Sequence, residues 1–138
     1  MYKFLSIILL LLFLALSGCG QKTLTLSGNV SFDGALLNDG GIVFVPIDNP
    51  QTEFKGKIIN GKYSISIPTT TTGKMIVRIY ALRQEKSKDY TPSEDELKLN
   101  SSIGMVSVMY IPKQYNTEST LTVEVSPTTT VFDFKLEK

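Results

Sequence analysis

Residues 54–68, FKGKIINGKYSISIP, decide the fold. Asn60-Gly61 is the pair that type I′ turns prefer, because both central residues of such a turn need a positive φ. After this pair, a tyrosine and two isoleucines alternate with serines, which is the period of a strand with one buried face. The stretch therefore predicts a β-hairpin with strands at 54–59 and 63–67.

The same alternation, divided by turn residues, continues on both sides of the hairpin. It predicts five more strands, at 24–32, 42–45, 75–82, 121–125 and 132–136, the third of them covered on both faces. Turn signals stand at 33–34, 38–41 and 126–127. Seven short strands at this spacing are typical of a sandwich or barrel. We expect an all-β fold, a seven-stranded antiparallel β-sandwich over residues 23–138.

One segment does not alternate. Residues 83–104 are rich in charge and exceed the usual length of a loop. Ser93 and Glu96 have capping-box spacing, so we expect a helical turn at 94–99. The apolar stretch 106–111 that follows is interpreted as either an extra edge strand or a covering segment.

Composition excludes several classes of function. The 138 residues suffice for one domain, and 14 Lys and Arg against 13 Asp and Glu leave no basic excess for nucleic acid. The chain has no histidine, which excludes His-based acid–base catalysis and His-ligated metals. Its one cysteine excludes an internal disulfide and a Cys cluster. We expect no cofactor, no metal and no enzymatic activity.

The N-terminus has the pattern of a targeting signal. Lys3 precedes an apolar run at 4–16, which suits a signal peptide and is short for a membrane span. The run ends at Leu16-Ser17-Gly18-Cys19, which resembles the lipobox of bacterial lipoproteins. The resemblance implies that signal peptidase II recognises Leu16, Ser17 and Gly18 and cuts before Cys19. It also implies that Cys19 carries a diacylglyceryl thioether and an acylated amine.

This interpretation divides the chain into a signal peptide at 1–18, a lipidated N-terminus and linker at 19–22, and the sandwich at 23–138. Two alternatives remain, an ordinary secretory peptide with a chance cysteine and a plain N-terminal membrane anchor. Gly20 stands where some bacteria place the Asp that retains lipoproteins in the inner membrane, which favours the periplasmic face of the outer membrane. Three linker residues reach about 10 Å, so the domain would sit directly on the lipid surface.

The order of motifs resembles small bacterial lipoproteins with a carboxypeptidase-regulatory-like, or transthyretin-like, domain. The pieces are 28–34 (GNVSFDG), 40–46 (GGIVFVP), 56–58 (GKI), 61–65 (GKYSI), 73–79 (GKMIVRI), 111–116 (IPKQYN), 121–125 (LTVEV) and 132–134 (FDF). The resemblance implies a prealbumin-like sandwich without peptidase activity. Leu36, where the family often has proline, and the segment 83–104 depart from the pattern.

The acidic residues do not have the patterns of a catalytic carboxylate pair or of a calcium site. Glu94, Asp95 and Glu96 form a charge run, which is usually a solvated face rather than a catalytic pair. Neither Asp48, Asn49 and Glu53 nor Asp89 with the acids after Pro92 has the spacing of a calcium loop. Turn formation explains the Asp48-Asn49-Pro50 stretch more simply.

The loop aromatics are the remaining candidates. Tyr63, directly after the hairpin turn, is expected to pack in the core. Tyr90, Tyr115 and Asn116 lie in loops, where they could contact a glycan or protein, although packing explains them too.

The function expected from these observations is that of a lipid-anchored, non-enzymatic binding or structural module of the cell envelope. Its partners would be the membrane, through the lipid on Cys19, and an envelope protein or glycan. The alternative is a lipoprotein that binds a small ligand or carbohydrate through the loops at the sandwich end or the segment 83–104. A third possibility is an accessory domain of an envelope enzyme.

Overall fold

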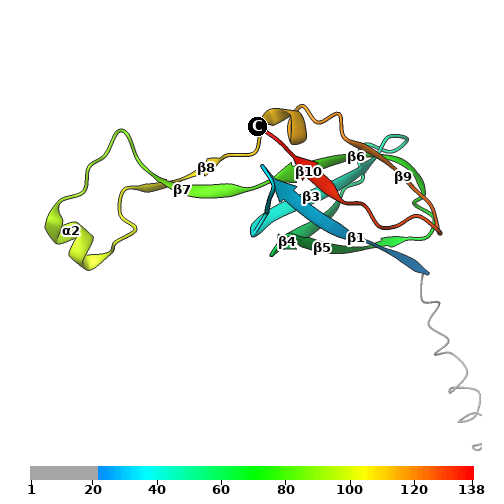
Figure 1. Cartoon of the computed structure of the whole chain (residues 1–138), viewed down its shortest axis with the longest axis horizontal. Coiled ribbons are helices and arrows are strands. Elements are labelled where there is room, and N and C mark those ends of the chain that lie inside the picture. The colour runs from blue at the N-terminus through cyan, green and yellow to red at the C-terminus, as the bar shows by residue number, and fades with distance from the viewer. Residues whose placement is uncertain (1–21) are drawn as a thin grey trace, which may run out of the picture.

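The computed structural model describes residues 22–138 (Figure 1). This part of the chain is all-β, with 52% strand and one short α-helix, as predicted. The predictions for the signal peptide at 1–18, its Leu16, Ser17 and Gly18 recognition residues and lipidation at Cys19 lie outside the described residues.

A curled sheet contains most of the strands. In spatial order these are β10 (Phe134–Leu136), β1 (Thr23–Phe32), β5 (Lys62–Pro68), β4 (Phe54–Ile59), β3 (Asp39–Pro46), β6 (Gly73–Tyr80) and β9 (Thr122–Val125), with β2 (Ala35–Leu36) beside β1. The neighbours along this order are antiparallel except β1 and β10, which run parallel. A separate two-stranded sheet pairs β7 (Leu82–Lys86) with β8 (Met105–Met109). The helices within residues 22–138 are α2 (Glu94–Leu99) and the 3₁₀ turn η2 (Lys113–Tyr115).

The predicted hairpin of β4 and β5 is confirmed, and it is also where the sheet bends. Asn60 and Gly61 have φ values of 51° and 75°, as a type I′ turn requires. The two strands pair only at Ile58–Tyr63 and Ile59–Lys62, next to the turn. Beyond these pairs β4 follows β3 and β5 follows β1. At Gly56, where the two strands no longer pair, a Cβ would lie 2.4 Å from Cγ1 of Ile65, so the absence of a side chain leaves room for Ile65.

The core lies inside the curl, where strands distant in the sheet order meet. On β5 the side chains of Tyr63, Ile65 and Ile67 are buried and the serines between them are exposed, as the alternation predicts. The Phe44 ring of β3 lies 5.8 Å from that of Tyr63 and 6.4 Å from that of Phe134 on β10. These centroid distances are those of packed aromatic pairs.

The C-terminal segment lies tightly along β1 at Gly28. The Phe132 N–H donates to the Ser27 carbonyl at 2.9 Å, and the Tyr63 hydroxyl donates to the Phe132 carbonyl at 2.8 Å. A Cβ on Gly28 would lie 1.9 Å from that carbonyl oxygen, so no larger residue fits here. Asp133 fixes the next position, since its carboxylate accepts from the Asn29 backbone N–H at 2.7 Å.

The body has two distinct ends (Figure 1). At one end β1 begins, with Thr23 opposite Pro68. The hairpin turn and the last residue of β6, Tyr80, lie at the other end, where Gly41 is opposite Tyr80. The β7–β8 sheet projects from that second end, away from the start of β1. The first strand begins at Thr23, one residue before the predicted start, with three residues between it and Cys19 in the sequence.

Four details differ from the sequence predictions. The turn expected at 38–41 is shorter, because Asp39 already pairs with Ile59 and begins β3. The strand expected at 75–82 ends at Tyr80, with one face buried and the other half-buried. The strand expected at 132–136 begins at Phe134, because Phe132 bonds to Ser27 instead. The prediction of a loop at 83–104 is wrong for residues 83–86, which belong to β7. The helical turn predicted at 94–99 is confirmed.

Gly28→Ala is expected to lower the free energy of unfolding by about 1–3 kcal/mol, the usual cost of overpacking. The reason is the close approach of the Phe132 carbonyl. Chemical denaturation of both variants measures the effect. Gly41→Ala is the matched control, because its Cβ would lie 3.9 Å from the nearest atom and should change little. Equal stability of the two variants would contradict the argument.

Candidate functional site

The strongest candidate site is the projection formed by β7, β8 and the residues between them, 82–109, here called the arm (Figure 1). Its two ends are anchored in the body by Ala81 and Ile111, each 2% exposed. The Tyr110 N–H continues the ladder by donating to the Ala81 carbonyl at 3.3 Å. The Tyr110 ring packs edge-on against Phe32, 5.7 Å between centroids. The base of the arm is therefore part of the core.

The tip of the arm is held by one carboxylate. Ser93 and Glu96 form the predicted capping box: Glu96 Oε2 accepts from the Ser93 backbone N–H at 2.8 Å, and Ser93 Oγ accepts from the Glu96 N–H. Glu96 Oε1 also accepts from the Tyr90 hydroxyl at 2.7 Å. The Tyr90 hydroxyl, then Ser93, hold the pKa of Glu96 below its usual value. α2 has no buried residue, so these bonds rather than packing fix its position.

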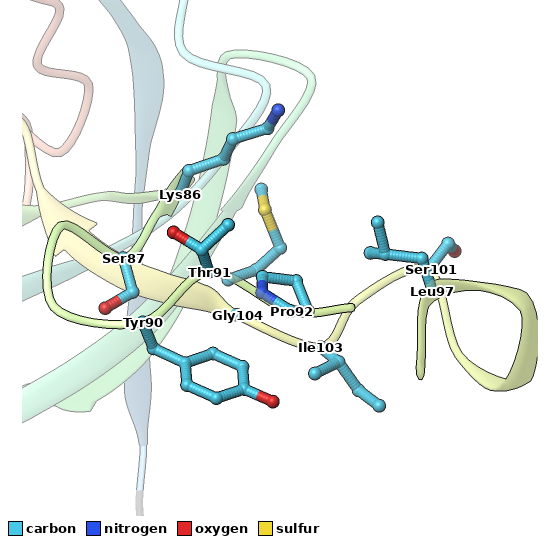
Figure 2. Close-up of a pocket in the computed structure, with 10 residues that line it drawn as sticks. Lys86, Ser87, Tyr90, Thr91, Pro92, Leu97, Ser101, Ile103 and Gly104 are labelled. Carbon is cyan, nitrogen blue, oxygen red and sulfur yellow. The ribbon is translucent and has the colours of Figure 1, made fainter. Parts of the chain in front are cut away.

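A small cavity of about 180 Å³ lies beneath the tip (Figure 2). Its wall is mainly apolar, with hydroxyls and one cation, and the lining residues are Lys86, Ser87, Tyr90, Thr91, Pro92, Leu97, Ser101, Ile103, Gly104 and Met105. No carboxylate lines it, so it offers no acid–base pair. Its volume is below the range of drug-sized sites. It can accept a small apolar group.

Exposed apolar side chains concentrate on the arm. Ten large hydrophobic side chains are exposed among the described residues, and six of them belong to the arm: Leu82, Tyr90, Leu97, Leu99, Val106 and Met109. Such a concentration on one projection is typical of a contact surface rather than of scattered surface residues.

The structure separates the predicted candidates into packing residues and surface residues. Tyr63 is 4% exposed, and burial raises the pKa of its phenol, so the predicted core role is confirmed. Asn116 is buried, and its amide donates to the Ile111 and Pro112 carbonyls, which makes it a structural residue of the η2 turn. Tyr115 packs against the core. Of the loop aromatics considered, Tyr90 lies in the arm.

The acidic candidates serve local structure. Glu94 and Asp95 are exposed, as predicted. The Asn49 N–H donates to the Pro46 carbonyl and the Thr52 N–H to the Asn49 carbonyl, so two consecutive turns cover the Asp48-Asn49-Pro50 stretch, in line with the predicted role in turn formation. Glu53 pairs with Lys55 and Arg78, which lower its pKa. Within residues 22–138 no three His, Cys, Asp or Glu side chains gather as metal ligands would, and neither helix has the length and hydropathy of a membrane span.

The sequence pattern located the tip of the arm and, as one of two alternatives, an edge strand at 106–111, which the structure has as β8 at Met105–Met109. The other strand of the stem, β7 (LRQEK), has no apolar alternation, so its residues 83–86 were not predicted as a strand. The alternating stretch at 105–109 was the available signal, because a short apolar strand far from the main sheet needs its own partner.

No protein-family model and no curated protein matches the chain. Among solved structures, a 9R-lipoxygenase from Cyanothece PCC8801 resembles 84% of this chain with a TM-score of 0.40 and 12% identity. The match spans 16% of the lipoxygenase chain. A similarity at this level supports no conclusion about function.

Glu96→Ala is expected to open the tip while leaving the body intact. Loss of the capping carboxylate should accelerate amide exchange at Leu97 and Asn100 roughly threefold to tenfold, because their N–H groups donate within this turn. The midpoint of global unfolding should stay unchanged, since α2 buries nothing. Asp95→Ala, which removes only an exposed pair with Lys98, is the control. Equal exchange in both variants would contradict the assignment.

The tip should also respond to pH. The pKa of Glu96 is lowered in the folded tip, so its contribution is present above the unfolded value of about 4.3 and is lost as pH falls through the lower folded value. The amide shift of Ser93, whose N–H donates to the Glu96 carboxylate at 2.8 Å, should therefore hold steady from neutral pH to about 5 and change below about 4. In Glu96→Gln this change should disappear from the tip. A transition that persists in this variant would assign the effect to another group.

Proposed function

We propose that this chain is a lipid-anchored, non-enzymatic lipoprotein of the bacterial cell envelope that presents its arm to a protein partner. The observation that carries the proposal is the placement of the two ends. The chain enters the body at Thr23, and the arm leaves from the opposite end (Figure 1). A lipid attached just before Thr23 would point the arm away from the membrane.

The short linker supports an orientation close to the membrane. Cys19 precedes Thr23 by three intervening residues, which reach about 10 Å when extended. The end of the body with the start of β1 would then rest on the headgroups. Each buried CH₂ of the acyl chains contributes roughly 0.8 kcal/mol, so two or three chains hold the protein firmly. Gly20 after the cysteine favours the periplasmic face of the outer membrane.

We further propose that the curled sheet is a prealbumin-like β-sandwich of the carboxypeptidase-regulatory-like type. The contacts of Phe44 with Tyr63 and Phe134 support two facing layers, because they join strands that are not neighbours in the sheet. The strict requirement for Gly28, within the first motif of the resemblance, supports the same assignment.

The direction and the causes of the pKa shifts of three carboxylates support a role in binding rather than catalysis. Asp33, Glu53 and Glu96 have lowered pKa values, and each is exposed or half-buried beside a lysine, an arginine or a hydroxyl that explains the shift. A catalytic acid would need a raised pKa in a cleft. Apolar exposure on the arm instead suits contact with another protein.

The second candidate function is binding of a small ligand in the cavity of the arm. The apolar wall of Tyr90, Pro92, Leu97 and Ile103 favours a small apolar ligand. It favours carbohydrate less, because no Asn, Asp, Glu or Gln lines the cavity to bind sugar hydroxyls. Titration with short alcohols or alkyl chains, followed through amide shifts at the tip, separates this function from protein binding.

Lipidation is tested by labelling cells with a fatty acid that carries a clickable group. The full chain should incorporate the label and should have the mass of residues 19–138 plus acyl groups. Cys19→Ser should incorporate none. As a control, a chain carrying both Cys19→Ser and Ser101→Cys keeps one cysteine, on the exposed tip, and should also stay unlabelled. Label in either variant, or an unmodified full chain, would contradict the proposal.

A further inference from the structure

The sequence of β8 reads the same in both directions. Residues 105–109 are Met-Val-Ser-Val-Met, with Ser107 at the centre. In an antiparallel pair of two such strands about a two-fold axis at Ser107, every residue meets its own kind. Met105 would face Met109 of the other copy, Val106 would face Val108, and the two Ser107 residues would face each other. Strand β8 is therefore self-complementary.

The backbone of β8 has the phase that this pairing needs. The Ser87 N–H donates to the Gly104 carbonyl at 2.7 Å, and the Tyr110 N–H donates to the Ala81 carbonyl. Because hydrogen-bonded and non-bonded pairs alternate in an antiparallel ladder, Val106 and Val108 bond toward β7. Met105, Ser107 and Met109 then direct their N–H and C=O groups outward. Ser107, on the two-fold axis, thus has its backbone N–H and C=O groups free to bond to the other copy.

The two edges of the arm differ in protection. Charged side chains on an edge strand oppose pairing with another chain. β7 carries Arg83, Glu85 and Lys86, whereas β8 carries no charge and no proline. Within the described residues β8 pairs with β7 alone, so its other edge has no strand beside it. The arm therefore favours pairing through β8.

We propose that two copies of this chain pair through antiparallel β8 strands, with the two-fold axis at Ser107. The two Ser107 residues exchange two backbone hydrogen bonds, and each Met109 N–H donates to the Met105 carbonyl of the other copy. The Met105 N–H takes no part in this pairing, because it already donates to the Ser102 carbonyl at 3.1 Å. The pair covers Val106 and Met109, which are 43% and 40% exposed in the single chain.

This inference rests on the proposed function only in taking the arm as the contact surface. It requires neither the lipid nor the tip cavity. A chain that is lipidated but stays monomeric would overturn the pairing and leave the proposed function standing. A full chain that pairs but is recovered from cells without lipid would overturn the proposed function and leave the pairing standing.

The first test places a charge at the axis. Ser107→Lys puts two like charges opposite each other in the pair, and we expect the dimer dissociation constant of the full chain in detergent to rise roughly tenfold or more. Gln84→Lys is the matched control, because Gln84 is also exposed and bonds to Ser107 across the arm at 2.8 Å, yet lies away from the free edge. Sedimentation across a concentration series measures both. A monomeric parent chain, or equal weakening by both variants, would overturn the proposal.

The second test covers the case in which the charge disturbs the arm itself. The Cα atoms of a hydrogen-bonded antiparallel pair lie about 5.5 Å apart, within reach of a disulfide. Mild oxidation of Ser107→Cys should therefore give a covalent dimer, and Gln84→Cys should give none beyond the level of the parent chain, which shares the same Cys19. Cross-linking at equal rates in the two variants would overturn the pairing. Attachment of Ser107→Cys to a different protein, without self-pairing, would assign the edge to that protein's strand.

Discussion

The packing of the C-terminal segment along β1 depends on the contact between Gly28 and the Phe132 carbonyl. The C-terminal segment can bond to β1 only because Gly28 has no side chain, and that bonding brings Phe134 into the core beside Phe44. The carbonyl that comes so close also accepts from the Tyr63 hydroxyl. Because Gly28 has no Cβ, the Phe132 carbonyl can approach β1 and accept from Tyr63 of β5, so the first strand, the central hairpin and the C-terminal segment pack together.

Much of the body could be predicted because its strands have one buried face each. Alternation located β1, β4 and β5 within a residue, and Asn60-Gly61 fixed the turn between the last two. Alternation does not report which strands are neighbours. The parallel pairing of β1 with β10 joins residues about a hundred positions apart in the sequence, and the close approach of Ile65 to Gly56 depends on how the two strands lie in space.

The candidate site was half predictable for a similar reason. The capping box is a local signal within four residues, so Ser93 and Glu96 located α2. β7 is charged on both faces because neither face is buried, and it therefore lacks the pattern by which strands are recognised. The tip cavity depends on residues from 86 to 105 folding over one another, which no local pattern encodes.

The body and the arm share one long axis, with the start of β1 at one extreme and the arm at the other (Figure 1). Joining two chains antiparallel through β8 would place their two starts at opposite extremes of the assembly. Lipids attached there would face apart. A pair anchored in one bilayer would therefore lie along its surface with a lipid at each extreme, whereas a pair between two facing bilayers would stand upright and bridge them.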